Sequence, residues 1–147
     1  MRKLKILCSI SARGGSKGIP RKNLKLLNRR PLLSYAIETA LQSKLIDKVI
    51  VNTEDEEIAD LAKKYGAEVP FVRSKELALD HITLTEVSKN SMNEMDKLGH
   101  KFDAILQLAP TCPFIESGSI DKVIQIMLEK DCDSVLSLKV IEHEHPY

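Results

Sequence analysis

Apolar residues alternate along this chain between two patterns, short continuous runs and longer stretches with helical spacing. The run at 4–10 (LKILCSI) is followed by a glycine-rich loop that no helix could cross, which predicts a buried strand. Pro31 then opens a predicted helix, whose apolar side chains recur at i, i+3, i+4, i+7 and i+8 and so form one buried face. These side chains are Leu33, Ala36, Ile37, Ala40 and Leu41.

The same alternation continues along the rest of the chain. Further strands are predicted at 48–53, 68–72, 102–108 and 133–140. Further helices are predicted from 54 to a cap at Gly66, from 83 to 98 before Gly99, and after a cap at Ser117 or Ser119. The apolar stripe of the last helix consists of Ile120, Val123, Ile124, Met127 and Leu128.

Strands that alternate with helices, without internal repeats, predict an α/β fold with a doubly wound, mostly parallel, Rossmann-like sheet. Ligands of such sheets bind beyond the carboxyl ends of the strands. We therefore expect the loops that start at Ser11, Thr53 and Ala109 to share one rim.

The charge of the chain is distributed unevenly. Of 22 Lys and Arg, ten lie in residues 1–30, which contain no Asp or Glu, so that residues 31–147 hold 12 basic against 21 acidic residues. The positive segment calls for an anionic ligand or surface. The 147 residues suffice for a core without disulfides, and Cys8, Cys112 and Cys132 cannot all pair. With no predicted signal peptide or membrane span, we expect a cytoplasmic protein with reduced thiols.

The segment 11–23 (SARGGSKGIPRKN) concentrates both glycine and positive charge. Gly14, Gly15 and Gly18 permit close approach and positive φ, so that several N–H groups could converge on one anion. Four cations surround them, namely Arg13, Lys17, Arg21 and Lys22. Backbone donors combined with Arg and Lys suit a polyphosphate, although the segment contains neither a Walker A loop nor the G-x-G-x-x-G of a dinucleotide fold.

Two other interpretations of this loop are weaker. A solvated basic turn would not need three glycines and four cations together. A nucleic-acid surface would spread positive charge over a wider face with aromatic stacking residues, yet the chain has six Phe and Tyr in all and is acidic after residue 30. We therefore expect neither nucleic acid nor membrane as a partner.

The segment 12–23 (ARGGSKGIPRKN) resembles the signature of the acylneuraminate cytidylyltransferases, the CMP-sialic acid synthetases and their relatives. The resemblance continues through 31–37, 51–59, 63–71, 73–80, 109–113 and 145–147. It implies the glycosyltransferase-A-like fold of nucleotide-diphospho-sugar transferases. It also implies transfer of CMP from CTP to the anomeric hydroxyl of a keto sugar acid, with Mg²⁺ and release of pyrophosphate.

The resemblance also implies roles for individual residues. Arg13 and Lys22 would hold the triphosphate and carry catalysis, and Asn23 would help to place the nucleotide. Arg73 would lie near the nucleotide, and the Thr83 hydroxyl would lie beside the cytidine. The remaining positions that match the nucleotide site are Ala12, Gly14, Gly15, Ser16, Lys17 and Ala109.

The sequence departs from the family pattern in two places. Ala109 stands where the family has a glutamine that reaches the cytosine, and Gln107 lies two residues earlier on the same strand face. The family also continues past 145–147 into a dimerisation hairpin and an Asp pair that binds Mg²⁺. We therefore expect 1–147 to form one nucleotide-binding domain, the N-terminal portion of a longer one. A non-catalytic nucleotide-binding module and a sugar nucleotidyltransferase for another base stay open as alternatives.

The other candidate residues receive ordinary interpretations. The His and Glu residues at 142–145 are expected to be a solvated segment, since no third ligand cluster is visible. His81 and His100 are expected at the surface, and Cys112 stands where the family has serine. Glu54 and Asp55 are expected to be acids at a helix start, although relatives carry an Asp near the site at the first position.

Overall fold

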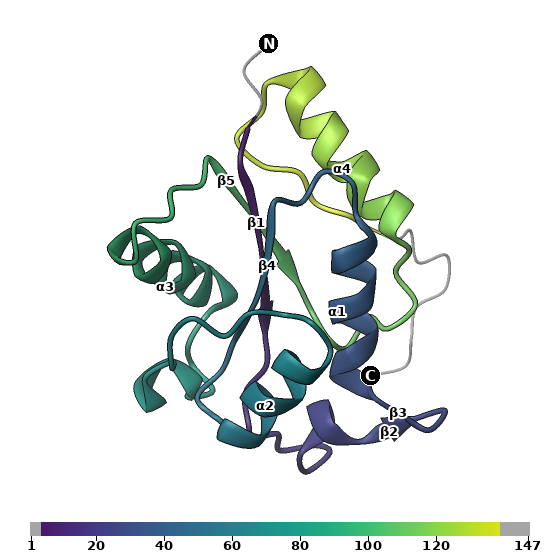
Figure 1. The fold of residues 1–147 in the computed structure, drawn as a ribbon, viewed down its shortest axis with the longest axis vertical. Helices are drawn as coiled ribbons and strands as arrows, with labels where there is room; N and C mark the ends of the chain where they lie inside the picture. The colour runs from purple at the N-terminus through teal and green to yellow at the C-terminus, as the bar shows by residue number, and fades with distance from the viewer. Residues whose placement is uncertain (1–3, 139–147) are drawn as a thin grey trace.

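The computed structural model describes residues 4–138, and its centre is a parallel sheet (Figure 1). The sheet contains β1 (Ile6–Ser11), β4 (Lys48–Asn52) and β5 (Ala104–Leu108) in the order β4-β1-β5. Both neighbours run parallel to β1, with Cys8 opposite Val49 on one side and Leu106 on the other. The three strands confirm the predicted parallel sheet, and their carboxyl ends lie at one edge.

Helices cover both faces of this sheet (Figure 1). The helices α1 (Leu32–Gln42), α2 (Glu56–Lys64) and α4 (Ser117–Lys130) pack on one face, and α3 (Leu84–Lys97) packs on the other. Alternate residues of β1 point to opposite faces, so that Cys8 joins the core under α1 while Leu7 packs against Met95 of α3. The predicted doubly wound architecture is therefore present. Chains of this length commonly form such a core without further cross-links.

Two predicted strands are absent from the described residues. In place of a strand at 68–72, a single bridge joins Ile50 to Glu68, because Pro70 has no N–H with which to continue a ladder. Residues 133–138 have no regular structure, since no neighbouring strand pairs with them, and Leu136 and Leu138 are exposed. Positions 139 and 140 of that prediction lie outside the described residues.

The structure also corrects two predicted details of the helices. The N-cap of α4 is Glu116, not Ser117 or Ser119, and its side chain makes no capping hydrogen bond. In α1 the predicted apolar face is buried except for Leu41, which is exposed. Gly66 and Gly99, by contrast, end their helices with positive φ as their positions predicted.

A small hairpin that the sequence pattern did not reveal links the glycine loop to α1. It follows a short 3₁₀ helix, η1 (Lys22–Leu24), and pairs β2 (Leu26–Leu27) with β3 (Arg30–Pro31). Asn28 and Arg29 make its turn, both with positive φ. Strands of two residues carry no alternation that periodicity could detect.

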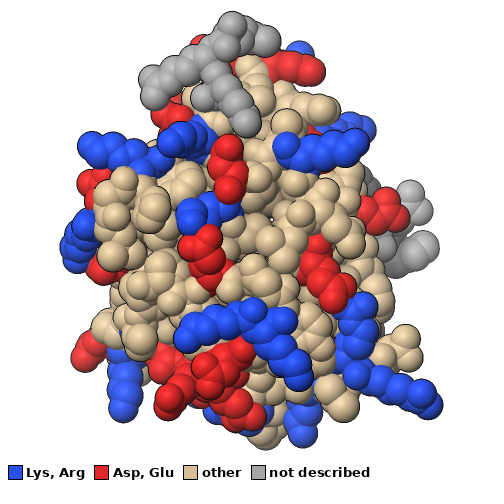
Figure 2. Space-filling view, in the orientation of Figure 1, with Lys and Arg blue, Asp and Glu red and all other residues tan. Residues whose placement is uncertain are grey.

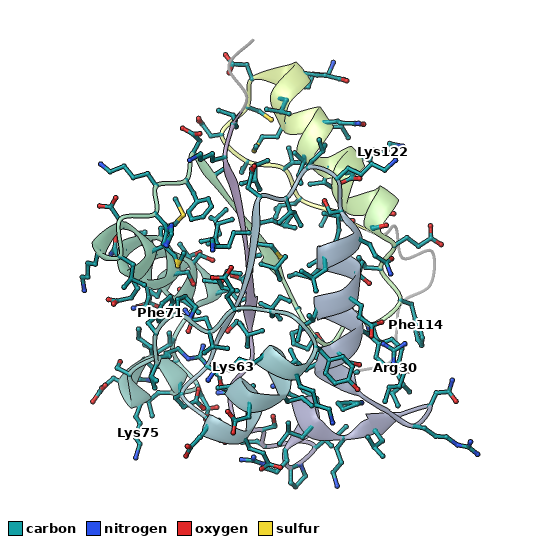
Figure 3. The ribbon with its side chains drawn as sticks, in the orientation of Figure 1. Arg30, Lys63, Phe71, Lys75, Phe114 and Lys122 are labelled. Carbon is teal, nitrogen blue, oxygen red and sulfur yellow. The ribbon has the colours of Figure 1, made fainter. Side chains whose placement is uncertain are left out.

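The surface mixes charges of both signs. On the face drawn in Figure 2, Lys and Arg are interspersed with Asp and Glu, and no single-sign field covers it. Figure 3 shows Phe114 projecting from the loop between β5 and α4, where its side chain is exposed. Within residues 4–138, no helix has both the length and the apolar character needed to cross a bilayer.

Candidate functional site

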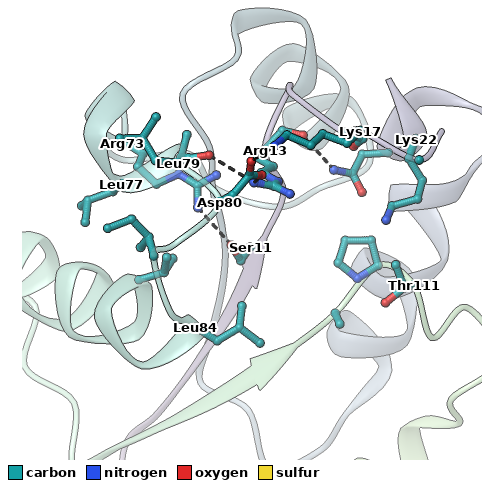
Figure 4. Close-up of a pocket in the computed structure, with 18 residues that line it drawn as sticks. Ser11, Arg13, Lys17, Lys22, Arg73, Leu77, Leu79, Asp80, Leu84 and Thr111 are labelled. Carbon is teal, nitrogen blue, oxygen red and sulfur yellow. Dashed lines mark hydrogen bonds and ion pairs between the residues drawn. The ribbon is translucent and has the colours of Figure 1, made fainter. Parts of the chain in front are cut away.

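A cavity of about 430 Å³ lies at the carboxyl ends of β1 and β5 (Figure 4). Its walls come from the glycine loop after β1, from the segment 73–87 and from the loop that starts at Ala109. The loop after Thr53 does not line the cavity. It is joined to the cavity wall by one bond, in which the Thr53 carbonyl accepts the backbone N–H of the lining residue Arg73 at 3.0 Å. Two of the three loops predicted to share a rim therefore meet at one cavity.

The cavity gathers most, but not all, of the predicted site residues. Its lining includes Arg13, Ser16, Lys17, Lys22, Asn23, Arg73 and Ala109. The predicted residues outside the lining are Ala12, Gly14, Gly15 and Thr83. Ala12 is part of the buried core. Thr83 is the N-cap of α3, where its hydroxyl accepts the Glu86 N–H in a capping box, while its neighbours Ile82 and Leu84 face the cavity.

The first part of the glycine loop bonds a neighbouring segment of the chain, whereas later residues of the loop line the cavity. Its first part is attached to the junction between β4 and α2, because the Gly14 N–H donates to Glu54 Oε1 at 2.7 Å. A Cβ on Gly14 would lie 2.5 Å from Asp55 Oδ2, so no larger residue fits there without movement. The expectation of positive φ at Gly14, Gly15 and Gly18 is wrong, and the left-handed residue of this loop is Arg21, with φ 54°.

Arg21 does not belong to the cavity. Its guanidinium donates to both oxygens of Asp55, at 2.6 and 3.2 Å, and pairs with Glu57 on α2. Burial raises the pKa of Asp55, but the bonds from Arg21 and from the Ile58 N–H hold that pKa below its ordinary value. Asp55 caps α2 through that N–H, as expected of an acid at a helix start. The predicted group of four loop cations is thus reduced to three.

Two of those three cations bond the same carboxylate of this chain, which the sequence pattern did not predict. Arg13 Nη1 donates to Asp80 Oδ1 at 2.8 Å, and Lys17 pairs with the other oxygen of Asp80 (Figure 4). The hydrogen bonds from Lys17 and Arg13, of which that from Lys17 has the larger effect, lower the pKa of Asp80. Of the three loop cations in the cavity, two are therefore paired and Lys22 has no carboxylate partner among the described residues.

Arg73 is almost completely buried and strongly held. Its Nη1 donates to Ser11 Oγ at 3.0 Å and its Nη2 to Glu54 Oε2 at 2.8 Å. Its Nε is buried and has no hydrogen-bond partner within 4–138. The expectation that Glu54 is a helix-start acid is wrong, because its carboxylate bonds the glycine loop and Arg73 instead of the first turn of α2.

The wall of the cavity beside Arg73 is largely apolar. Leu77, Leu79 and Leu84 lie on that side in Figure 4, across from Lys17 and Lys22. The Ala109 methyl group adds to the apolar lining and cannot hydrogen-bond. A cavity with cations on one side and apolar side chains on the other suits a ligand with a charged part and a flat apolar part.

Gln107, the other glutamine considered from the sequence, does not line the cavity. Its Oε1 accepts the Ser88 hydroxyl at 2.8 Å, which ties it to α3, and its Nε2 is buried with no partner among the described residues. Nothing in its bonding directs it toward the cavity.

Comparison with known proteins identifies the family. Residues 7–146 match the family described as Cytidylyltransferase. This chain belongs to the cytidylyltransferase family. It is 37% identical over 143 residues to the pseudaminic acid cytidylyltransferase of Campylobacter jejuni, an alignment that covers 97% of this chain and 61% of that protein. It is 37% identical over 123 residues to the CMP-N,N'-diacetyllegionaminic acid synthase of Legionella pneumophila, covering 84% of this chain and 53% of that protein.

The fold agrees with that membership. A solved CMP:2-keto-3-deoxy-manno-octonic acid synthetase, complexed with CTP, superposes with a TM-score of 0.72 at 24% identity, covering 86% of this chain and 48% of that one. The predicted nucleotide-sugar-transferase type of α/β fold is thereby confirmed. The chain spans between half and two thirds of the length of the two sequence relatives, the pseudaminic acid cytidylyltransferase and the legionaminic acid synthase.

The described residues do not form a site for the Mg²⁺ that the resemblance implies. Among residues 4–138, no group of three or more His, Cys, Asp or Glu side chains could hold a metal ion. Magnesium is usually bound through carboxylates and substrate phosphates, but Asp80 in the cavity lining is bonded to Arg13, and Glu54 is bonded to the lining residue Arg73. These residues therefore do not fit Mg²⁺ by themselves.

The remaining candidates behave as ordinary residues where they can be described. His81 and His100 are exposed, as predicted, and the His and Glu residues at 142–145 lie outside the described part. All three cysteines are unpaired, and burial raises the pKa of the Cys8 thiol to about 12. That thiol is therefore unreactive near neutral pH.

Proposed function

We propose that this chain is the nucleotide-binding portion of an enzyme that transfers CMP from CTP to a nonulosonic, sialic-acid-like keto sugar acid. The anomeric hydroxyl of the sugar attacks the α-phosphorus of CTP. The bond from that phosphorus to the bridging oxygen breaks, pyrophosphate leaves, and the hydroxyl proton passes to solvent. Two relatives named for pseudaminic and legionaminic acid support this class of acceptor.

The observation that carries the proposal is the two-sided cavity at the strand ends. We assign the triphosphate to the side with Arg13, Lys17 and Lys22, and the base to the apolar wall. Phosphoryl transfer depends mainly on positioning and on neutralising charge on the phosphate oxygens, which these cations provide. Loss of one such contact costs on the order of 10² to 10³ in rate, by analogy with a single oxyanion donor.

The other predicted residues support this arrangement in different ways. Asn23 is buried and its Nδ2 donates to the Arg13 carbonyl at 3.1 Å, so we assign it to bracing the loop under the nucleotide. Ser16 is assigned to the phosphates. Arg73 is assigned to the nucleotide beside the apolar wall. Ala109 leaves cytosine selection to backbone groups or to other residues of the cavity.

The remaining positions are assigned to the shape of the site instead of to ligand contact. Ala12, Gly14 and Gly15 form the backbone that leads into the loop, and Thr83 fixes the start of α3 next to the cavity. We infer that Mg²⁺ accompanies CTP and that the reaction takes place in the cytoplasm. Residues 4–138 are assigned no metal ligand, and residues 1–147 are taken as a single domain.

Binding and turnover test the proposal with a matched pair of lysine variants. Lys22→Ala removes a cavity cation, whereas Lys25→Ala removes an exposed cation outside the cavity. Titration calorimetry with CTP is expected to show at least tenfold weaker binding for Lys22→Ala and unchanged binding for Lys25→Ala. Equal affinity in the two variants would contradict the assigned site.

Pyrophosphate release is then measured with CTP, Mg²⁺ and a panel of keto sugar acids that includes N-acetylneuraminate. Release that requires both substrates supports the enzyme. CTP binding without turnover on any acid would indicate a non-catalytic nucleotide-binding module. UTP or ATP that binds at least ten times more tightly than CTP would reject cytidine as the base.

A further inference from the structure

Glu54 connects two parts of the site that lie far apart in the sequence. Its Oε1 accepts the Gly14 N–H at 2.7 Å, and its Oε2 accepts Arg73 Nη2 at 2.8 Å. Gly14 lies 40 residues before it and Arg73 lies 19 residues after it. One carboxylate therefore spans from the glycine loop to the cation beside the apolar wall, although Glu54 itself does not line the cavity.

The Glu54–Arg73 pair is more deeply buried than the other ion pairs of the loop. The exposed fractions of the two side chains are 14% for Glu54 and 2% for Arg73, whereas Asp80 beside Arg13 and Lys17 is 47% exposed. A buried pair holds its geometry because breaking it leaves an uncompensated charge away from water. Exposed pairs impose no such constraint, since water replaces the lost partner.

Two hydrogen bonds hold the guanidinium of Arg73 in place. Glu54 and Ser11 occupy Nη2 and Nη1, and the buried Nε has no partner within the described residues. Arg73 lines the cavity, and these two bonds hold its guanidinium through both terminal nitrogens while using two of its five N–H groups.

We propose that Glu54 is a positioning residue of the nucleotide site, which holds the glycine loop and Arg73 in one binding geometry. This inference rests on the function proposed above. Glu54 acts through Gly14 and Arg73 and touches no ligand. Its loss is therefore expected to weaken nucleotide binding through the misplacement of both.

Glutamine is an informative replacement because both partners of Glu54 are donors. A glutamine side chain offers one acceptor oxygen and one NH₂ donor, so Glu54→Gln preserves shape but must place a donor against either Gly14 N–H or Arg73. Glu56→Gln is the matched control, because Glu56 lies two residues after Glu54, in the first turn of α2, and its side chain is exposed. The variant therefore removes the same charge without removing a bond to the site. Glu54→Asp keeps the charge but is one methylene shorter, and provides a second variant if Glu54→Gln does not fold.

The assay is CTP binding by calorimetry on variants whose folding is verified by thermal unfolding. We expect Glu54→Gln to weaken CTP binding at least tenfold, Glu54→Asp to weaken it less, and Glu56→Gln to leave it within twofold of wild type. In a double-mutant cycle, Glu54→Gln is expected to weaken CTP binding less in the Arg73→Gln background than in wild type, because only the route through Gly14 then remains. A purely structural role would lower the melting temperature and leave CTP affinity of the folded protein unchanged.

A measurement made without nucleotide tests the positioning role of Glu54 separately from the proposed CTP-dependent function. Hydrogen exchange of the Gly14 amide, followed by NMR, is expected to be at least tenfold faster in Glu54→Gln than in wild type. Equal exchange rates, or a folded Glu54→Gln protein with wild-type CTP affinity, would overturn the positioning role. A wild-type protein that binds no CTP would overturn the proposed function instead, and the exchange of Gly14 would still report whether Glu54 holds the loop.

Discussion

A methyl group at position 14 cannot be accommodated unless Asp55 moves. The Cβ of an alanine there would lie 2.5 Å from Asp55 Oδ2 and 3.1 Å from both Cβ and Cγ of that residue. Asp55 is itself restrained, because Oδ1 accepts the Ile58 N–H at 3.0 Å as the N-cap of α2 and both oxygens bind Arg21. Gly14→Ala therefore requires displacement of the cap.

The size of the effect follows from the contacts that would be lost. Loss of an N-cap aspartate costs about 1 kcal/mol, and forcing an extra methyl group into a tight contact costs about 1–3 kcal/mol. The exposed part of the ion pair with Arg21 adds little. A total of about 3 kcal/mol lowers the melting temperature of a chain of this length by about 6–12 °C.

Thermal unfolding followed by circular dichroism measures this change, with Gly15→Ala as the control. No atom lies within 4 Å of a Cβ built on Gly15, and its φ is not positive, so that variant should melt at or slightly above the wild-type temperature. If Gly14→Ala melts within 1 °C of Gly15→Ala, the argument that the loop is fastened through Asp55 is refuted.

Three further predictions concern the charges of the loop and the polar core. Arg21→Ala should lower the melting temperature by a few degrees yet leave CTP affinity within twofold of wild type, because Arg21 faces α2; a tenfold loss in calorimetry would place it in the site. The cations bonded to Asp80 lower its pKa in the folded protein, so its stabilising effect is present above its ordinary pKa of about 4 and disappears as pH falls through the lower folded pKa. Unfolding scans between pH 2 and 6 should therefore show wild type losing more stability toward acid than Asp80→Asn, and parallel curves would contradict the pairing. Ser91→Ala should cost about 1–3 kcal/mol in denaturant unfolding, because it removes the hydrogen-bond partner of the buried Ser9 hydroxyl and one of the two partners of Asn52 Nδ2; a cost below 0.5 kcal/mol would show that these groups find others.

The sequence allowed the main elements to be predicted because their signals are local. The run that became β1 and the helical spacing that became α1 are each contained in a dozen residues, and so are the caps of α2 and α3. The hairpin of β2 and β3 is too short for a period to show. The strand expected at 68–72 failed because its apolar run contains Pro70, a local signal that deserved more weight.

The cations of the site were predicted, but their partners were not. Arg13 meets Asp80 across 67 positions and Arg21 meets Asp55 across 34, and no spacing rule connects residues so far apart. Composition gave the same weight to Arg21 and Lys22, which are adjacent in sequence, whereas the fold turns one toward α2 and the other into the cavity. The left-handed backbone at Arg21 separates them.

Any anion that binds Arg13 and Lys17 must compete with the carboxylate of Asp80, which already pairs with both. An incoming anion must displace a tethered group whose effective concentration is on the order of millimolar for a short flexible connection. Inorganic phosphate or chloride, with little charge to offer, competes poorly against it. A triphosphate can take both released cations at once and also reach Lys22, which no described carboxylate occupies. We therefore expect the protein to bind polyanions in preference to inorganic phosphate or chloride, with an affinity set by the difference in free energy between its ion pairs with the ligand and those with Asp80.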